Sequence, residues 1–386
     1  MPVSRYTYIP NLLPDIYIYM RFVFASYVYT QEFNQPKHWL KRINLYTGIL
    51  EELSTTNEVI SIEQINYEGQ LSNNGVDYRF LRFSARALKY APLKLHRYIK
   101  SLQPDVVVIQ GLHFPLQVIQ LRLLLGPKVK IIAQNHAEKP FYGPKKVLQQ
   151  LADRCINAYL FASYPMGIEW VAKGNLASAE KIHEVMEVSS VFYPINSNVA
   201  RQQTKVNGSP AFLWVGRLNP NKDPVTVVRA FLKFAEKNTH ARLYMIYHTD
   251  ELLHVIKVLL ATQPKQAGAI TLIGRVDHEE LLYWYNSCDF IIAGSHYEGS
   301  GTAVCEAMSC GCVPVVTDIL SFRMITDDGK CGALYEPGNE KALLNVLKHT
   351  QQMDMPAKKA HTLNYFKQHL SFRAIAQKIE RIAASL

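Results

Sequence analysis

Residues 293–318 read AGSHYEGSGTAVCEAMSCGCVPVVTD and place two glutamates around a glycine-rich turn. The apolar run at 289–293 has the length and flanking turn residues of a buried parallel strand, and residues 313–316 predict the next one. Between them, glycines and serines predict a sharp turn into a helix that begins near Thr302. This order of strand, turn, helix and strand predicts an α/β unit with a parallel sheet.

The turn into this helix is suited to bind an anion, because free backbone N–H groups and the positive end of the helix dipole face the space beyond the strand. Glu298 lies in the turn and Glu306 lies inside the helix. Carboxylates accept hydrogen bonds and repel a bare phosphate. The two glutamates therefore favour a ligand that carries hydroxyls as well as phosphate, as a sugar nucleotide does.

Strand and helix patterns alternate along most of the chain, and its 386 residues predict two domains. We expect an extension at 1–19, a Rossmann-like domain at 20–193, a polar, proline-flanked linker at 194–210 and a second Rossmann-like domain at 211–365. A last helix at 366–386 is expected to return to the N-terminal domain. In the first domain, residues 66–76 are expected to form a loop and residues 78–102 one long helix. The predicted fold class is therefore α/β, with two Rossmann-like domains that face an interdomain cleft.

The net charge of +10 favours a partner that carries phosphate, although a solvated basic surface without a partner explains it equally well. No RNA-binding signature and no run of five basic residues occurs, which argues against nucleic acid. The expected helix from Arg79 to Lys100 is rich in cations and is a candidate for peripheral contact with an anionic membrane, with an ordinary solvated face as the alternative. These cations are Arg82, Arg86, Lys89, Lys94, Arg97 and Lys100.

The six cysteines form no C-x-x-C pair, and no secretory signal or run of 18 apolar residues is present. Buried, reduced thiols and a cytoplasmic location are the expectation. Without a matching cluster of histidines and cysteines, we expect no metal site and no cofactor.

Two further strand ends in the second half carry candidate site residues. One strand ends in Gly216 and Arg217, and Lys222 follows before a helix, an arrangement that suits a diphosphate. Another ends at Gly274, Arg275 and Val276, where a planar base could lie against exposed backbone. Taken alone, an arginine and a lysine in a loop more often form a solvated surface.

The motifs of the second half occur in a fixed order. They are Gly216-Arg217-x4-Lys222, Ile273-Gly274-x-Val276, Glu298-Gly299-x-Gly301-x4-Glu306-Ala307-Met308 and Asp328-Gly329-x2-Gly332. Over about residues 211 to 350 this order and spacing closely resemble the nucleotide-binding half of retaining GT-B glycosyltransferases of family four, the glycosyl transferases group 1. The first half is similar only more loosely, through strand order, Pro104-Asp105-Val106-Val107 and its histidines.

The resemblance implies transfer of a hexose-type sugar from a UDP- or GDP-sugar in the cleft, with retention of configuration and without a metal, to a glycan or lipid-linked acceptor. By it, Arg217 and Lys222 hold the diphosphate, the backbone at 274–276 meets the base, and Glu306 accepts from the ribose. Glu298 would contact the donor sugar, beside backbone contacts from Gly299, Ser300, Gly301 and Thr302.

The opposite wall of the cleft is expected to supply a histidine near the transferred sugar. His113, at a strand end, is the first candidate for this catalytic role and His136 the second. A histidine at a strand end is more often structural, which stays the alternative for both.

Three departures from the family pattern bear on function. Ser300 replaces a frequent aromatic residue, residues 320–324 replace a glycine-rich loop, and the bulky residues 27–31 replace glycines after the first strand. The third departure favours an alternative function, a catalytically silent GT-B-like subunit that binds nucleotide-sugar. A sugar-nucleotide epimerase of the same architecture is a further alternative.

Overall fold

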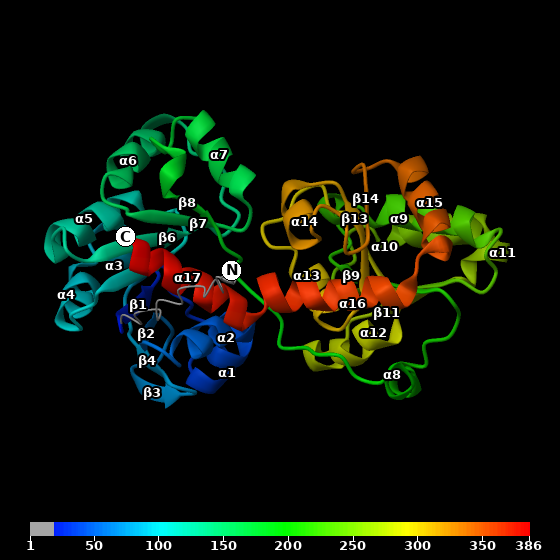
Figure 1. The fold of residues 1–386 in the computed structure, drawn as a ribbon, viewed down its shortest axis with the longest axis horizontal. Helices are drawn as coiled ribbons and strands as arrows, with labels where there is room; N and C mark the ends of the chain where they lie inside the picture. Colours follow the sequence, from blue (N-terminus) through cyan, green and yellow to red (C-terminus); the bar gives the residue numbers. More distant parts are fainter. Residues whose placement is uncertain (1–18) are drawn as a thin grey trace, which may run out of the picture.

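The computed structural model describes residues 19–386, which form two α/β domains side by side (Figure 1). The extension predicted for residues 1–19 therefore lies outside the described residues except for Tyr19. Each domain is built around its own sheet, and the predicted fold class is confirmed.

The sheet of the N-terminal domain has eight strands, which are parallel except for the edge pair β3–β4. Its central strands are rich in buried valines and isoleucines. This composition is typical of strands that helices cover on both faces of the sheet. In spatial order the strands are β3 (Gly69–Asn73), β4 (Val76–Phe80), β2 (Glu58–Glu63), β1 (Arg21–Ala25), β5 (Val106–Gln110), β6 (Lys130–Gln134), β7 (Ala158–Phe161) and β8 (Ile182–Glu184).

Helices cover both faces of this sheet. The face with α1 (Pro36–Arg42) and α2 (Asn44–Leu53) buries Ile49 and Leu50. The other face packs Leu88, Leu121 and Trp170 against strand residues. The helices on that face are α3 (Ala85–Tyr90), α4 (Leu93–Ser101), α5 (Pro115–Leu125), α6 (Gly143–Asp153) and α7 (Tyr164–Ala172).

The structure corrects two expectations in this domain. Residues 66–76 are not a plain loop, because Asn74 and Gly75, with φ of 47° and 83°, form the tight turn of the β3–β4 hairpin. The expected helix at 78–102 is wrong: Arg79 belongs to β4, and Pro92 separates α3 from α4. The cationic helix offered as a membrane contact therefore does not exist as one element.

The sheet of the C-terminal domain has six strands, all parallel. Their order is β11 (Ile270–Gly274), β10 (Arg242–Tyr247), β9 (Ala211–Gly216), β12 (Phe290–Ala293), β13 (Val313–Thr317) and β14 (Ala333–Tyr335). The helices around it are α9 (Pro224–Ala235), α10 (Leu253–Thr262), α11 (Pro264–Ala267), α12 (Leu281–Ser287), α13 (Thr302–Ser309), α14 (Leu320–Ile325), α15 (Glu340–His349) and α16 (Met355–Tyr365).

The chain crosses between the domains twice. The first crossing leads into α8 (Ser197–Thr204), which lies in the predicted linker and packs against α12. The second follows α16, and α17 (Phe372–Ser385) then packs against α2 of the N-terminal domain (Figure 1). There the Glu380 carboxylate accepts from Thr56 Oγ1 at 2.8 Å and Asn57 Nδ2 at 2.6 Å.

No helix within residues 19–386 has the length and apolar character needed to cross a bilayer. The same range contains no group of three or more histidine, cysteine or acidic side chains arranged to hold a metal ion.

Candidate functional site

The turn between β12 and α13 depends on a glycine. Gly301, the residue before α13, has a φ of 60°, and a Cβ there would lie 2.7 Å from Phe322 Cε1. Glycine adopts this left-handed backbone without strain, and its lack of a Cβ leaves room for Phe322. The first N–H groups of α13, from Thr302 on, are thereby held at the carboxyl end of the sheet, where ligands bind in such folds.

Lys222 and Glu298 meet at this turn. Lys222 Nζ donates to Glu298 Oε1, and both side chains are mostly buried, with 29% and 14% of their surface exposed. The two side chains, with Gly301 and Ser295, line a small pocket at the start of α13. Two residues predicted to act separately, one on phosphate and one on sugar, are thus an ion pair in the absence of ligand.

Other predicted donor-binding residues lie around this pair. Gly216 ends β9, and Arg217 is exposed and forms no ion pair within residues 19–386. Ser300 is buried and precedes Gly301. Gly274 ends β11 with a φ of 85°, followed by the exposed Arg275 and the half-buried Val276.

Glu306 is buried inside α13, and both of its oxygens already accept hydrogen bonds. His278 Nε2 lies 2.7 Å from Oε1, and Tyr285 Oη donates to Oε2 at 2.9 Å. The hydrogen bond to Glu306 raises the pKa of His278 against the opposing effect of burial. Each carboxylate oxygen can accept a second hydrogen bond, so Glu306 keeps capacity for a ribose. Sequence reasoning missed His278, although it follows Val276 by only two residues.

The loop that carries Glu298 also touches the N-terminal domain. Tyr297 Oη donates to the Ala137 carbonyl at 3.0 Å. A Cβ on Gly299 would lie 2.6 Å from Ala137 Cβ and 3.3 Å from Glu187 Oε1. The loop at 297–299 and residues 137 and 187 therefore form one continuous surface across the domain boundary.

His136, the second candidate, lies in this contact region. Its Nδ1 pairs with Glu187 and its Nε2 lies 2.8 Å from Gln110 Oε1. Burial lowers the pKa of His136, but the hydrogen bond and charge of Glu187, with the charge of Glu138, raise it overall. The ring is held between two strand ends, which fixes its orientation toward the cleft.

Glu138 orders the loops on either side of His136. Its carboxylate accepts from Leu112 N at 2.8 Å, His136 N at 2.6 Å and Asn135 Nδ2 at 2.9 Å. These bonds tie the end of β5 to the end of β6. Sequence reasoning missed Glu138, Glu187 and Gln110, because their partners are distant in sequence or are backbone groups.

His113, the first candidate, makes its contacts within its own domain. The ring is exposed, its Nδ1 lies 3.1 Å from Lys145 Nζ, and it stacks on Phe141 with 5.8 Å between ring centroids. Burial lowers its pKa. The structure does not bring His113 against the loop at 297–299 as it does Ala137 and Glu187, and its catalytic role stays a prediction.

The first of the bulky residues after β1 lies in the core of the N-terminal domain. Tyr27 is buried, its Oη lies 3.0 Å from His96 Nε2, and its ring packs 5.2 Å from that of Phe114. This tyrosine belongs to the core between the sheet and α3–α5. Its ring therefore faces α3–α5 and not the face of the sheet that α1 and α2 cover.

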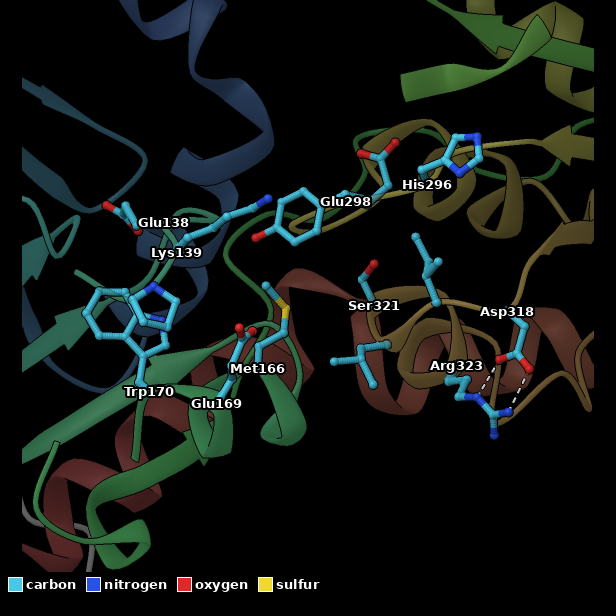
Figure 2. A pocket seen from close by; sticks show the side chains of 14 residues that line it. Glu138, Lys139, Met166, Glu169, Trp170, His296, Glu298, Asp318, Ser321 and Arg323 are labelled. Carbon is cyan, nitrogen blue, oxygen red and sulfur yellow. Dashed lines mark hydrogen bonds and ion pairs between the residues drawn. The ribbon is translucent and has the colours of Figure 1, made fainter. Parts of the chain in front are cut away.

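Two hollows adjoin the contact region. Figure 2 shows the larger one, about 750 Å³, between the domains, with Glu138, Lys139 and Trp170 on one side and Glu298 and Arg323 on the other. The second, about 590 Å³, lies in the N-terminal domain beside His136 and Gln110. Its other lining residues include Trp39, Tyr46 and Glu63.

Comparisons with known proteins agree with this geometry. Residues 196–365 match the family model described as glycosyl transferases group 1. The O-antigen chain mannosyltransferase RfbU of Salmonella typhimurium is 22% identical over 224 residues, which are 56% of this chain and 60% of that protein. The O-antigen chain mannosyltransferase B of Escherichia coli is 26% identical over 137 residues, 34% of each chain. The matches thus span less than two thirds of either relative.

Solved structures share the fold over nearly the whole chain. A glycosyltransferase from Rickettsia africae has a TM-score of 0.70 at 14% identity and covers 95% of this chain and 98% of its own. HepE of Anabaena in complex with UDP has a TM-score of 0.65 at 14% identity and covers 95% and 100%. At such identity the likeness concerns the fold. Over residues 196–365 the chain is thus similar to the glycosyl transferases group 1 family, and its fold is GT-B.

Proposed function

We propose that the chain transfers a hexose from a UDP- or GDP-sugar, bound in the interdomain cleft, to a hydroxyl of a glycan or lipid-linked acceptor, with retention of configuration. The observation that carries the proposal is the group at the start of α13, where Lys222 and Glu298 meet beside the helix N-terminus. This group combines cationic donors for phosphate with a carboxylate for sugar hydroxyls. HepE, a neighbour in fold, is described in complex with UDP.

The charge that develops during such a transfer lies on the departing diphosphate. The bond between the anomeric carbon and the phosphate oxygen breaks, and the acceptor oxygen bonds to the same face of that carbon. Lys222, Arg217 and the N–H groups of α13 would stabilise the diphosphate as it leaves. An acceptor that attacks from the same face lies beside the departing oxygen, which would take the acceptor proton.

We place the acceptor in the hollow of the N-terminal domain beside His136. Trp39 and Tyr46 offer aromatic surface to a sugar ring. The Glu63 carboxylate, held by Trp39 Nε1 at 2.8 Å and Ser61 Oγ at 2.6 Å, offers an acceptor for its hydroxyls. Both curated relatives are named as O-antigen chain mannosyltransferases, so mannose donors and glycan acceptors come first among those to test.

The alternative of a catalytically silent subunit loses part of its support. It rested on bulky residues after the first strand, and one of them, Tyr27, is buried in the core. The cytoplasm is the proposed location, supported by six free cysteines, five of them buried.

The test is a panel of UDP- and GDP-sugars, assayed for nucleotide release with and without glycan acceptors. Lys222→Ala is expected to lower kcat/KM by about a hundredfold or more, since it removes one fixed cation from the leaving group. Lys237→Ala, at an exposed position of the same domain, is the matched control. Nucleotide binding without turnover across the whole panel would contradict the transferase and favour the silent subunit.

A further inference from the structure

The positive charge of the chain is concentrated in one stretch, from the end of β4 to the end of α6. Residues 81–154 contain 13 of the 42 lysines and arginines but only 3 of the 32 aspartates and glutamates. The stretch therefore carries an excess of ten cations, which equals the net charge of the whole chain. In the remaining residues the positive and negative charges cancel. Such a distribution indicates a localised electrostatic surface rather than a generally basic protein.

The cations of this stretch are not neutralised by the fold. None of the 13 forms an ion pair with a residue in 19–386, whereas many cations elsewhere do. Nine of them are exposed, including all five on α3 and α4. Of the three acids, Glu138 and Asp153 are buried, and Asp105 accepts from the Arg21 backbone at the other end of the sheet. The outer surface of these helices thus presents cations with almost no counter-charge.

The same helices expose apolar side chains. Of the 21 large hydrophobic residues that are exposed within residues 19–386, eight fall in this stretch. Leu123 on α5 is 80% exposed and Tyr142, before α6, is 73% exposed. The others are Tyr90, Leu93, Leu116, Val147, Leu148 and Leu151. Exposed apolar residues mixed with unpaired cations are typical of surfaces that lie on a membrane.

These residues share one side of the molecule. Helices α3 to α6 cover the same face of the N-terminal sheet, with Leu88, Leu95 and Leu121 packed inward, and they lie at the end of the molecule far from the C-terminal domain (Figure 1). Hydrogen bonds from Gln117 and Gln120 of α5 to carbonyls of residues 88–90 hold α3 and α5 together. The surface reaches the cleft where Lys139, just before α6, lines the interdomain hollow.

We propose that the outer surface of α3–α6, the basic apolar face, docks the protein on an anionic lipid bilayer. The cations lie against the lipid headgroups, and Leu123, Tyr142 and Leu148 enter the headgroup and acyl boundary. The apolar residues favour a bilayer over RNA, which would be read by cations and stacked aromatics. The inference does not depend on transfer activity.

The experiment is sedimentation of the full chain with vesicles of phosphatidylcholine, alone and mixed with phosphatidylglycerol. Wild type is expected to bind only the mixed vesicles, and more weakly at high salt. The variant Arg86→Glu, Lys94→Glu, Arg97→Glu should weaken this binding at least about a hundredfold. The matched control, Lys237→Glu, Lys265→Glu, Lys348→Glu, makes the same change in net charge at exposed positions of the other domain. It should weaken binding only about threefold or less.

A second variant separates insertion from simple charge attraction. Leu123→Ser with Leu148→Ser keeps the net charge and is expected to weaken binding about tenfold. All substituted positions are exposed, and unchanged melting temperatures will show that the variants fold. The proposal is overturned if the charge variant binds vesicles like wild type, or if the control variant loses as much vesicle binding. It is also overturned if the protein binds RNA homopolymers but binds no vesicles.

Discussion

The two walls of the cleft are built in different ways. The C-terminal wall comes from one short stretch, in which Glu298, Gly301 and Glu306 lie within nine residues, joined by Lys222 from a neighbouring strand end. The N-terminal wall is assembled from the ends of β5, β6 and β8, which bring Gln110, His136 and Glu187 together. A wall formed by residues that are close in sequence can be recognised as a sequence motif. A wall assembled from distant strand ends can be recognised only from the folded structure.

The two walls also differ in whether their charged side chains form ion pairs. Lys222 on the C-terminal side is paired with Glu298 and partly buried. The helices behind the N-terminal wall carry cations without partners. The first arrangement suits a small anionic ligand that replaces or joins an internal ion pair. The second suits an extended anionic surface outside the protein.

The largest expected effect comes from breaking the turn of the C-terminal wall. Gly301→Ala should lower the free energy of unfolding by about 3 kcal/mol, because a Cβ strains the left-handed backbone and overlaps Phe322. Gly268→Ala is the control, since its φ is −64° and no atom lies within 4 Å of a Cβ there. Thermal or urea unfolding measures both, and equal stability of the two variants would contradict the role given to Gly301.

The next effect concerns the core behind the N-terminal wall and its response to pH. Burial lowers the pKa of His96 to about 4, against 6.5 in the unfolded chain. As pH falls through this window, the unfolded chain takes up a proton that His96 does not take up in the folded state, so the native state should lose about 2 kcal/mol of stability. His96→Gln should show a smaller loss between about pH 6.5 and 4 in urea unfolding. The same substitution at exposed His38 is the control. It should leave the dependence of the unfolding free energy on pH as it is in the wild type.

The smallest expected effect decides between the two histidines of the N-terminal wall. His136→Gln should lower kcat/KM by about tenfold to a hundredfold, because it disturbs the group held between Gln110 and Glu187 beside the donor loop. His113→Gln should change kcat/KM by less than about threefold, since its partners are Lys145 and Phe141. Steady-state kinetics at matched melting temperatures measures both. The reverse order would restore His113 as the residue near the transferred sugar.

The fold could be predicted from sequence mainly where pattern and turn chemistry agree. The strand at 313–317 and the helix that begins at Thr302 appear where the sequence predicted them, because apolar runs end at clear turn residues. The hairpin at Asn74 and Gly75 was missed although this pair is typical of tight hairpin turns. A loop was expected at residues 66–76 instead, followed by a helix from residue 78.

The candidate site could be predicted only in part for a related reason. Glu298, Lys222 and Glu306 follow from local motifs, but their pairing with one another and with His278 and Tyr285 depends on side-chain packing. Tyr27 shows the converse. Its position after the first strand indicated the cleft. In the structure its side chain is directed toward His96, so it does not line the cleft.

The return of α17 to the N-terminal domain has a consequence for biosynthesis. Ile375 and Ile379 of α17 complete the core that α2 covers, and Lys130 of β6 donates to the Ala383 carbonyl. The ribosome makes the N-terminal domain first, yet that domain lacks this helix until nearly 200 further residues have been translated. A domain that usually folds first during synthesis must here wait, with one face of its sheet incompletely covered, for a segment translated after the whole of its neighbour.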